Sequence, residues 1–501
     1  MIVLERIDNQ RYSFANSKKE GMKMVARILT FNNTDPYAYS SKIRMFDKKE
    51  KTFRIGMLEN VLSYCRDNRV QIEMYDYDYE TIGAESIDER LKGKYIHQQR
   101  AVTAFFKRRF GILKVPTRGG KTFIASEIIR QFLRMNKNGR FLFVVDSVDL
   151  FNQAKGDFQK FFAPYGGIKI GEIKDGKVDF NQTGVTIAMA QTLQSVFSKR
   201  NSDRKKRSLV SKYLKSVDFL CVDEIHDNFS ASRKAVYNRC SNISFFLGLS
   251  ATPYKSENFV QNLYLQEWTG GVVYEISEKI LRERGVLSQY KVFLFIIDHN
   301  EKEIKIENDD YNEYRQKIIL TNEDRDNYMV RIIESLNNMG LKTLVLFQSV
   351  GHGKAIGERM GIPFISGETK SAERQERTKE FLSNSDGVLF ASGIFKKGIT
   401  LPEAQVLINA DGGLEDANTT QKKGRVLGST ETKNRSLIID FIDIFDVYFS
   451  EHSETRLNNY VNAIGEDNVG LLDTSADDCF SVFENWVKRW FNITGNYSVT
   501  R

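Results

Sequence analysis

The stretch FGILKVPTRGGKTFIASEII contains the side chains best suited to binding phosphate. An apolar run leads to Gly119 and Gly120, then to Lys121 and Thr122, and a helical pattern follows. Glycines let the backbone approach phosphates closely, and a helix N-terminus directs its N–H groups and dipole at negative charge. In such loops the lysine reaches the β- and γ-phosphates of a nucleotide, and the threonine hydroxyl binds Mg²⁺. The strict pattern has glycine six residues before the lysine, where this chain has Val115.

A pair of carboxylates complements this loop. In the stretch VDFLCVDEIHD an apolar run ends at Asp223 and Glu224, about a hundred residues after the glycine pair. Asp223 would hold Mg²⁺ through water, and Glu224 would orient or deprotonate the water that attacks the nucleotide. The alternative is a chance glycine-rich loop with a solvated acidic pair, but both stretches directly follow apolar runs typical of buried strands. Together they predict a Mg²⁺-dependent nucleoside triphosphatase.

Short apolar runs that alternate with helical patterns surround both stretches. Between residues 95 and 285 these runs are FGILKV, GRFLFVVD, GVTIAMA, VDFLCVDE and FFLGLSA. Between residues 290 and 450 they are KTLVLFQS, GIPFIS, GVLFAS, AQVLINAD and RSLIIDFID. Near-continuous apolar strands are typical of parallel sheets buried on both faces, and intervening helices indicate βαβ units. The sequence therefore predicts an α/β protein with two tandem parallel-sheet domains.

Two smaller regions flank the predicted α/β domains. Residues 1–85 combine strand patterns in ILTFNN, KIRMFDKKEKTFRI and VQIEMYDYDY with a helical pattern in GMLENVLSYCRDN, which predicts a small α+β domain. The α/β domains are then expected at 86–285 and 286–450, and a helical extension packed on the second one at 451–501. That extension has an aromatic stripe, which more often packs on its own domain than on a partner: Phe480, Phe483, Trp486, Val487 and Trp490.

Composition narrows the class of protein further. The chain has 501 residues, 73 basic and 65 acidic side chains and a pI of about 9.0, which favours a polyanionic partner such as nucleic acid. Its four cysteines form no CxxC pair, so neither a zinc ribbon nor a disulfide framework is indicated. No apolar run approaches the roughly 18 residues that a membrane span needs, and the N-terminus does not resemble a signal peptide. We expect a soluble, cytoplasmic protein.

Ten tracts resemble the motifs of superfamily 2 helicases and translocases, in the order of that family. They are IHQQRAV, VPTRGGKT, VDSVDLFNQ, AMAQTL, DEIH, LSATP, LFQSVGHGKAI, ISGETKSAER, ASGIFKKGITLPEAQVLI and QKKGRVLG. DEIH together with SATP is the most specific combination. The VGHGKAI tract, SGE with Arg374 downstream and HSETRLNNY are similar to UvsW-type recombination helicases of large tailed phages. The resemblance covers about residues 90–450 and implies two RecA-like domains that use ATP and Mg²⁺.

This resemblance assigns roles to individual residues. Catalysis would involve Lys121, Asp223, Glu224, Gln421 and Arg425, and the metal would be held by Thr122 and Asp223. ATP would be bound by Gln98, which reads adenine, by Gly398, and by the loop residues Pro116, Thr117, Arg118, Gly119, Gly120, Lys121 and Thr122. Contact with DNA, or its coupling to the nucleotide, would fall to Ser147, Gln191, Thr192, Ser250, Thr252, Gln348, Ser349, Lys396 and Lys397. Contacts of this kind go mostly to phosphates and are salt-sensitive.

The last tract departs from the family pattern. Gly428 stands where the family has an arginine that contacts the γ-phosphate, and Arg118 stands in the phosphate loop where the family commonly has a small residue. Either Arg425 acts alone, or Arg118 or a lysine of GIFKK supplies the missing charge, or hydrolysis is slow. Our hypothesis is that Arg118 supplies the charge.

The resemblance implies an ATP-dependent DNA helicase or translocase. It would act as a monomer on branched, forked or duplex DNA, with a single strand in the motor groove, in the cytoplasm of an infected bacterium if phage-encoded. The N-terminal domain would assist DNA binding through SSKIRMFDKKEKTFRI; the alternative there is an exposed charged hairpin. The basic run 199–215 is interpreted as a solvated face, with a groove-flanking contact as the alternative. An RNA-dependent ATPase and an annealing protein with impaired hydrolysis are the alternative functions.

Overall fold

The computed structural model forms two compact units, Met1–Ser277 and Glu278–Arg501. It describes residues 1–33, 40–76, 93–181, 183–198, 203–254, 259–299, 311–384, 387–392, 401, 403–411, 428–430, 433–445 and 447–493. The first unit contains the N-terminal domain and the first α/β domain, and the second unit contains the other α/β domain. Each unit is described by itself. Among the described residues, no helix combines the length and the hydropathy that crossing a bilayer requires.

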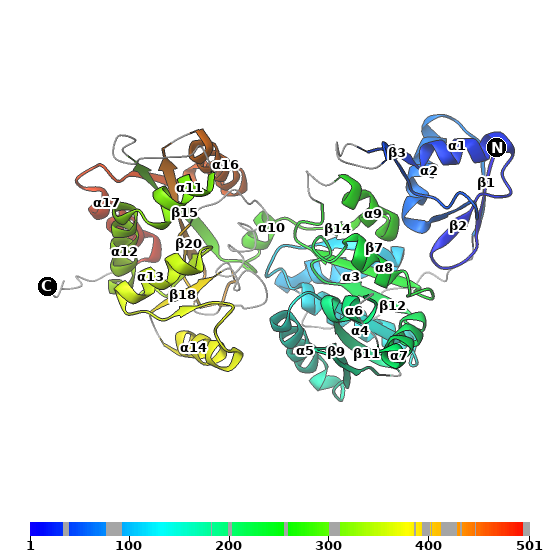
Figure 1. Cartoon of the computed structure of the whole chain (residues 1–501), viewed down its shortest axis with the longest axis horizontal. Helices are drawn as coiled ribbons and strands as arrows, with labels where there is room; N and C mark the ends of the chain where they lie inside the picture. Colours follow the sequence, from blue (N-terminus) through cyan, green and yellow to red (C-terminus); the bar gives the residue numbers. More distant parts are fainter. Residues whose placement is uncertain are drawn as a thin grey trace. The chain divides into compact units, whose positions relative to one another are not determined.

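The N-terminal domain is a small α+β domain (blue in Figure 1). Its sheet has the order β5-β2-β1-β6, in which β1 pairs antiparallel with β2 and parallel with β6. The elements are β1 (Ile2–Arg6), β2 (Arg11–Ser13), α1 (Lys19–Ile28), β3 (Thr30–Asn32), β4 (Lys42–Arg44), β5 (Thr52–Arg54), α2 (Leu58–Asp67) and β6 (Ile72–Tyr75). Sequence analysis identified neither β1, β2 nor α1, because these elements are short and their burial depends on neighbours distant in the sequence.

The first α/β domain is built on a mostly parallel sheet with helices on both faces. The strand order is β10-β9-β11-β8-β12-β13-β7-β14, and only the β9–β10 pair is antiparallel among the described pairings. The strands are β7 (Phe110–Lys114), β8 (Arg140–Val145), β9 (Ile170–Lys174), β10 (Lys177–Asp179), β11 (Gly184–Met189), β12 (Phe219–Val222), β13 (Phe245–Ser250) and β14 (Val272–Glu275). The helices are α3 (Ile96–Arg108), α4 (Lys121–Met135), α5 (Val148–Phe162), α6 (Ala190–Val196), α7 (Arg204–Lys215), α8 (Ala231–Tyr237) and α9 (Phe259–Thr269).

Aromatic side chains pack one face of this sheet, and a mixed aliphatic and aromatic layer packs the other. Phe105 of α3 and Phe132 of α4 lie against Phe219 and Phe245 of the strands, with ring centroids 5.2–6.5 Å apart. The opposite face buries side chains of α6 to α9 against the strands, including Trp268. Burial on both faces explains why these strands are near-continuous apolar runs, and it confirms the predicted α/β class.

The second α/β domain repeats this architecture. Its sheet has the order β17-β18-β16-β19-β20-β15-β21, and all described pairings are parallel. The strands are β15 (Gln289–Asp298), β16 (Thr343–Phe347), β17 (Phe364–Ile365), β18 (Val388–Ser392), β19 (Val406–Asn409), β20 (Arg435–Ile444) and β21 (Val469–Asp473). The helices are α10 (Glu278–Glu283), α11 (Tyr311–Arg315), α12 (Glu323–Asn338), α13 (Val350–Met360), α14 (Ser371–Ser383), α16 (Val447–Ile464) and α17 (Cys479–Phe491).

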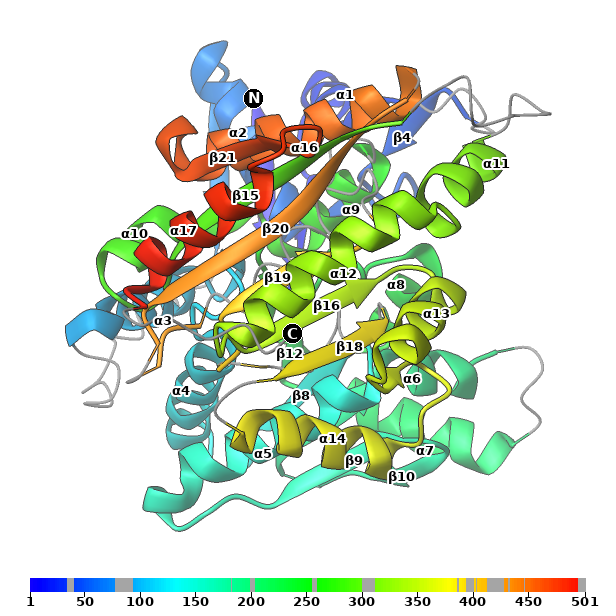
Figure 2. The same ribbon diagram turned by 90° about the vertical axis from the view of Figure 1, so that its left-hand side faces the viewer.

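The C-terminal segment completes this second sheet. Figure 2 shows α12, α13 and α17 covering one face, where Phe480, Phe483 and Val487 of α17 are buried in the core. Tyr460 of α16 is buried against the other face. Strand β21 lies within the segment that was predicted as a helical extension. It is an edge strand whose alternate residues stay exposed, so its sequence lacks the apolar run of a central strand.

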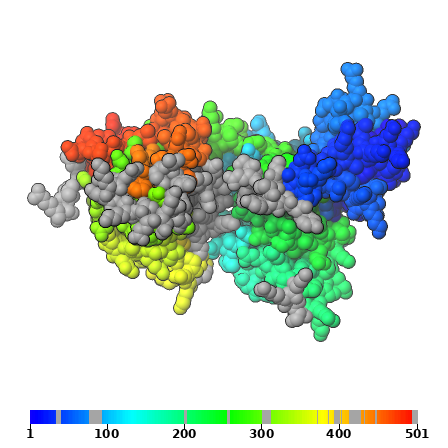
Figure 3. Space-filling view, turned by 45° about the horizontal axis from the view of Figure 1, so that its top comes forward, coloured from blue at the N-terminus to red at the C-terminus, as the bar shows by residue number. Residues whose placement is uncertain are grey.

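Helix α9 joins the N-terminal domain to the first α/β domain. The Arg54 guanidinium lies 3.7 Å from the centre of the Trp268 ring. The Gln10 amide donates to the carbonyl oxygens of Cys240 and Ser241, and Leu263 of α9 is buried in the core of the N-terminal domain. In Figure 3 the blue N-terminal domain lies directly against the green surface of the α/β domain. These contacts make the N-terminal domain part of the same compact unit.

Gly56 provides a direct test of this attachment. A β-carbon at residue 56 would overlap the carbonyl oxygens of Gln266 and Glu267 at the end of α9. We expect Gly56→Ala to lower the free energy of unfolding by about 1–3 kcal/mol, because backbone atoms must move. Thermal and urea unfolding measure the change.

Gly156→Ala is the matched control, because residue 156 lies inside α5 with open space around it. This control should stabilise the protein by about 0.5–1 kcal/mol, since alanine favours helix more than glycine does. If Gly56→Ala unfolded like the wild type, α9 would not be a tight attachment.

Candidate nucleotide site and nucleic-acid interface

The phosphate loop connects β7 to α4 at the carboxyl edge of the first sheet. Val115 N–H donates to the Ser250 carbonyl, and Gly119 N–H donates to the Pro116 carbonyl in a tight turn. Arg118 and Gly120 both have left-handed backbone conformations, with φ of 70° and 89°. Within the described residues, no side chain caps the N-terminus of α4. The first turn of this helix therefore keeps N–H groups available for an anion, as a phosphate site requires.

Two side chains of helix α3 contact the phosphate loop. His97 Nε2 lies 2.8 Å from the Gly119 carbonyl oxygen, and the Gln98 amide lies 3.3 Å from the same oxygen. Both side chains are buried, and a β-carbon at Gly120 would overlap the Gln98 amide. The structure thus places Gln98 against the loop, and its role as reader of adenine remains a prediction. Sequence analysis did not assign His97, although it adjoins Gln98 in the same tract.

The predicted catalytic groups meet at this edge. Lys121 Nζ lies 2.9 Å from Glu224 Oε1, and both side chains are mostly buried. Burial and the neighbouring Glu224 raise the pKa of Asp223 to about 7. Burial opposes ionisation of Glu224 as well, but the charges of Lys121 and His226 and the hydrogen bond from Lys121 together hold the pKa of Glu224 below its ordinary value. Glu224 also has φ of 42°, an uncommon conformation for a non-glycine residue that is frequent at functional sites.

These residues fit a nucleotide with Mg²⁺. The Oε2 atom of Glu224 is buried and accepts no hydrogen bond from the part of the chain that the structure describes. Beside it, the raised pKa of Asp223 shows that two carboxylates lie together with one lysine to balance them. A divalent cation would favour the ionised form of Asp223, and the oxygen-rich donor set suits Mg²⁺. Thr122, at the second position of α4, would contribute its hydroxyl.

A buried histidine links this acidic pair to the SATP segment. His226 Nδ1 lies 2.8 Å from Ser250 Oγ, which also accepts from the N–H of Thr252. The carbonyl of His226 accepts from the Gln261 amide of α9 at 2.6 Å. The strand order β12-β13-β7 explains the proximity, because DEIH, SATP and the phosphate loop follow three adjacent strands. Ser250 therefore contacts the acidic segment and Thr252 contacts Ser250, while the coupling role of both residues remains a prediction.

Arg118 and Gly428 occupy different environments. Burial lowers the pKa of Arg118 to about 10, while the charge of Asp157 on α5 opposes that shift. Gly428 pairs with Leu287 in an isolated β-bridge, and its carbonyl accepts from Ser288 Oγ at 3.0 Å. The Gly428 position is buried in the second domain. The hypothesis that Arg118 replaces the family's final arginine stays a prediction.

The predicted nucleic-acid residues differ in their surroundings. Ser147 caps α5 by accepting from Leu150 N–H, and Ser349 caps α13 by accepting from His352 N–H. Gln191 is exposed at the start of α6, whereas Thr192 beside it is 9% exposed. The backbone N–H groups of Gln348 and Ser349 both donate to Asp411. Five predicted site residues lie outside the described residues: Lys396, Lys397, Gly398, Gln421 and Arg425.

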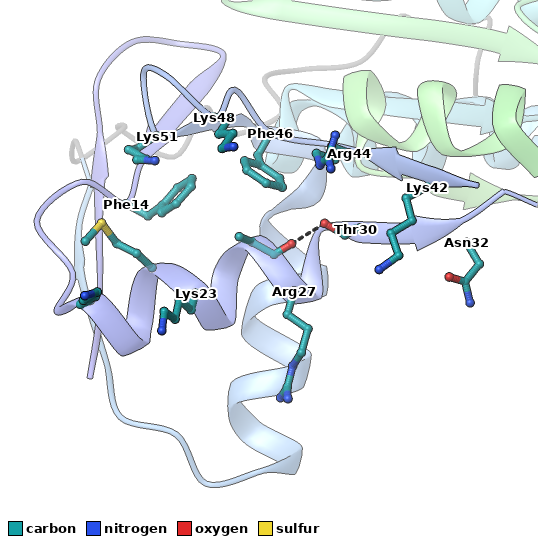
Figure 4. Close-up of a pocket in the computed structure, with 13 residues that line it drawn as sticks. Phe14, Lys23, Arg27, Thr30, Asn32, Lys42, Arg44, Phe46, Lys48 and Lys51 are labelled. Atoms are coloured by element: carbon teal, nitrogen blue, oxygen red, sulfur yellow. Dashed lines mark hydrogen bonds between the residues drawn. The ribbon is translucent and has the colours of Figure 1, made fainter. Parts of the chain in front are cut away.

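A basic groove crosses the N-terminal domain between α1 and the β3–β4 hairpin (Figure 4). Its volume is about 650 Å³, and Phe14, Met22 and Phe46 contribute apolar surface to it. Among the described residues that line it none is acidic, and seven are basic: Lys19, Lys23, Arg27, Lys42, Arg44, Lys48 and Lys51. Four cations of the predicted basic stretch thus line one groove: Lys42, Arg44, Lys48 and Lys51. Arg54 of that stretch instead packs on Trp268.

The fold and the site together define an ATP-hydrolysing superfamily 2 helicase or translocase. Residues 79–255 match the family described as type III restriction enzyme, res subunit, and residues 324–427 match the helicase conserved C-terminal domain. The chain belongs to this superfamily, which confirms the predicted resemblance and the use of ATP.

Individual relatives agree with this assignment. The ATP-dependent DNA helicase uvsW of Enterobacteria phage T4 is 23% identical, with 97% of each chain covered. Helicase 22 of Sulfolobus islandicus filamentous virus is 25% identical over 68% of this chain, which spans 62% of that relative's length. Among solved structures, a fragment of an HsdR subunit of a type I restriction enzyme from Vibrio vulnificus has a TM-score of 0.56 and 17% identity, with 86% of this chain and 76% of that chain covered. This likeness supports the fold.

Glu224→Gln tests the catalytic assignment. We expect ATP hydrolysis to fall by about 10²–10⁴-fold, because glutamine cannot accept a proton from water. Nucleotide binding should persist, since Lys121 and the loop remain. Steady-state hydrolysis and fluorescent-nucleotide titration measure the two effects.

Glu172→Gln is a matched control, because Glu172 is also 17% exposed and also pairs with a lysine, Lys155. Its hydrolysis rate should equal that of the wild type. Normal turnover by Glu224→Gln would contradict the assignment of Glu224.

Proposed function

We propose that this protein is an ATP-dependent DNA helicase or translocase that remodels branched or forked DNA. The observation that supports this most directly is the meeting of Lys121, Glu224, Asp223 and the SATP segment at one sheet edge. The whole-length similarity to the phage helicase adds DNA as the substrate class. The protein would act as a monomer with Mg²⁺ as its metal, in the cytoplasm of an infected bacterium if it is phage-encoded.

The residues of the first domain have distinct tasks in hydrolysis. ATP with Mg²⁺ supplies a phosphoanhydride whose γ-phosphate is activated for attack by water. When ATP binds, Lys121 would leave Glu224 and contact the phosphates instead. The Glu224 carboxylate would then be free to orient and deprotonate water. Asp223 and Thr122 hold the metal. In the second domain, Gln421, Arg425 and Gly398 would contribute to nucleotide contacts, and Lys396 and Lys397 would contact the DNA backbone.

Contacts around His226 would carry the nucleotide state to the DNA-binding parts. His226 touches Ser250 through its ring, and its carbonyl accepts from Gln261 of α9. Further along α9, Gln266 donates to Asn60 of the N-terminal domain, and Leu263 lies in that domain's core. A shift of the acidic segment therefore reaches the N-terminal domain through one helix. Ligand-dependent movement of this kind converts differential binding energy into motion.

The basic groove would hold a DNA backbone. Seven cations without an acidic neighbour in the lining attract phosphates irrespective of base sequence. Since the domain is tightly attached through α9, DNA held in the groove would move together with the first α/β domain. This arrangement suits a motor that must keep hold of one arm of a branched substrate.

Lys121→Ala tests the proposed motor. We expect hydrolysis to be abolished while DNA binding stays measurable, because the groove lies apart from the phosphate loop in the sequence and carries its own cations. ATPase rates are compared with no nucleic acid, single-stranded DNA, duplex, four-way junction and RNA. Strong stimulation by RNA alone would contradict the proposal, and so would a Lys121→Ala variant that turns over ATP normally.

Arg44→Ala with Lys48→Ala tests the groove. Both side chains are exposed and line it. We expect weaker binding to all DNA sequences and a decrease of about 2 in the slope of log affinity against log salt concentration. Lys107→Ala with Arg108→Ala, an exposed pair at the end of α3, is the matched control and should leave both values unchanged. Equal slopes for the two double variants would exclude the groove as a phosphate contact.

A further inference from the structure

A buried histidine in the second domain bridges two carboxylates. His352 is 4% exposed at the start of α13. Its Nδ1 lies 2.7 Å from Asp411 Oδ1, and its Nε2 lies 2.8 Å from Asp326 Oδ1 of α12. The ring also stands edge-on to Phe347, at 5.3 Å between centroids. Figure 2 shows α12 and α13 side by side on one face of the sheet.

The same Asp411 holds the loop that follows β16. Its second oxygen, Oδ2, accepts from Gln348 N–H and from Ser349 N–H, both at 2.6 Å. The Ser349 hydroxyl then accepts from His352 N–H at 3.3 Å, which closes a ring of contacts. Asp411 follows β19 directly, and β16 pairs with β19 in parallel, so the ring lies at the carboxyl edge of the sheet. Ligands of parallel α/β sheets bind at this edge.

The charges around His352 favour its protonated form. Asp326 and Asp411 face the two ring nitrogens, and a neutral imidazole could donate to one of them only. Arg325 of α12 bonds Asp443 of β20 at 2.8 Å, and its charge also acts on Asp411 and Asp326. On α13 itself, Lys354 pairs with Glu368 at the surface. The imidazolium of His352 is the cation that is hydrogen-bonded to both carboxylates, and the charge of Arg325 supports it.

We propose that His352 is a positioning residue for nucleic-acid binding: as an imidazolium it holds Asp411, and through Asp411 the Gln348–Ser349 loop, in the form that contacts DNA. The inference rests on the proposed function, because that function makes the loop a DNA contact. If the His352 ring loses its proton, Asp411 no longer faces the positive charge of that ring. The N–H groups of Gln348 and Ser349, which donate to Asp411 at 2.6 Å, would then lose a fixed acceptor. The loop would then lose its orientation toward DNA.

The pH range in which His352 is protonated follows from the groups around its ring. Burial alone would lower the pKa of His352, but the hydrogen bonds to Asp326 and Asp411 raise it to about 9. The folded pKa thus exceeds the ordinary value of 6.5. The contribution of the bridge is complete below about pH 6.5 and is lost as pH rises through about 9.

His352→Gln and Asp326→Asn test the inference in the full chain. At pH 7.5 we expect His352→Gln to raise the Kd for a forked DNA, and to lower the fold-stimulation of ATPase by that DNA, about tenfold. In the wild type, Kd should rise to the His352→Gln value as pH passes about 9. Asp326→Asn removes one carboxylate that stabilises the imidazolium, so the pH at which affinity falls should shift downward. If the bridge had a purely structural role, Asp326→Asn would lower thermal stability without moving the pH at which DNA affinity falls.

His452→Gln is the matched control for substitution of a histidine and for all other pH effects. It should follow the wild type at every pH, because residue 452 lies on α16. That helix packs on the face of the sheet opposite to α12 and α13, away from the His352 bridge. If the wild type responds to DNA while His352→Gln matches it in Kd and stimulation, this inference fails and the proposed function stands. An unshifted pH midpoint in Asp326→Asn would also overturn it. If the wild type shows neither DNA binding nor stimulation, the proposed function fails and the inference fails with it.

Discussion

Parallel strand pairing is the constraint on which the chemistry of this protein depends. In a parallel sheet all carboxyl ends meet at one edge, so segments that are far apart in the sequence become neighbours there. The order β12-β13-β7 brings the acidic pair, Ser250 and the phosphate loop together. An order that moved β12 away from β13 and β7 would separate Lys121 from Glu224, whose contact at 2.9 Å is the central interaction of the site. Buried apolar strands make this order stable, because both faces of the sheet are covered by helices.

The second domain applies the same constraint to a different set of groups. Adjacent strands β16 and β19 bring Gln348 and Ser349 to Asp411, and α12 and α13 add Asp326 and His352 around it. A buried carboxylate is costly without compensation, and each carboxylate here has a cation and hydrogen-bond donors. The result is a rigid loop at the edge where ligands of such sheets bind. One domain thus places hydrolytic groups at its carboxyl edge, and the other places a charge-balanced loop there.

Helix α9 gives the N-terminal domain its place in the first unit. It begins shortly after the SATP segment, donates a hydrogen bond from the Gln261 amide to the His226 carbonyl, and ends against Gly56 and Arg54. The stacking of Arg54 on Trp268 removes a cation from the surface and uses it for attachment. Four other cations of the same stretch line the groove: Lys42, Arg44, Lys48 and Lys51. Attachment to the first α/β domain and the proposed DNA contact would therefore involve different residues of one basic stretch.

The sequence by itself determined the two α/β domains, the phosphate loop and the acidic pair. Each of these depends on local order: an apolar run, then glycines with Lys121 and Thr122, or an apolar run that ends at Asp223 and Glu224. It also determined the superfamily, because DEIH and SATP occur in the expected succession.

Only the tertiary structure decided which side chains meet across the chain. His97 supports the phosphate loop, Arg54 turns away from the basic groove, and His352 bridges two carboxylates that lie 26 and 59 residues away. Strand β21 also emerged only in the folded sheet, because it is an edge strand whose alternate residues stay exposed. Strand β15 was missed as well, although its residues VFLFII form an apolar run of the kind that predicts a buried strand. The physical reason is common to all of these except β15: burial and charge balance depend on neighbours in space, and sequence spacing does not specify them.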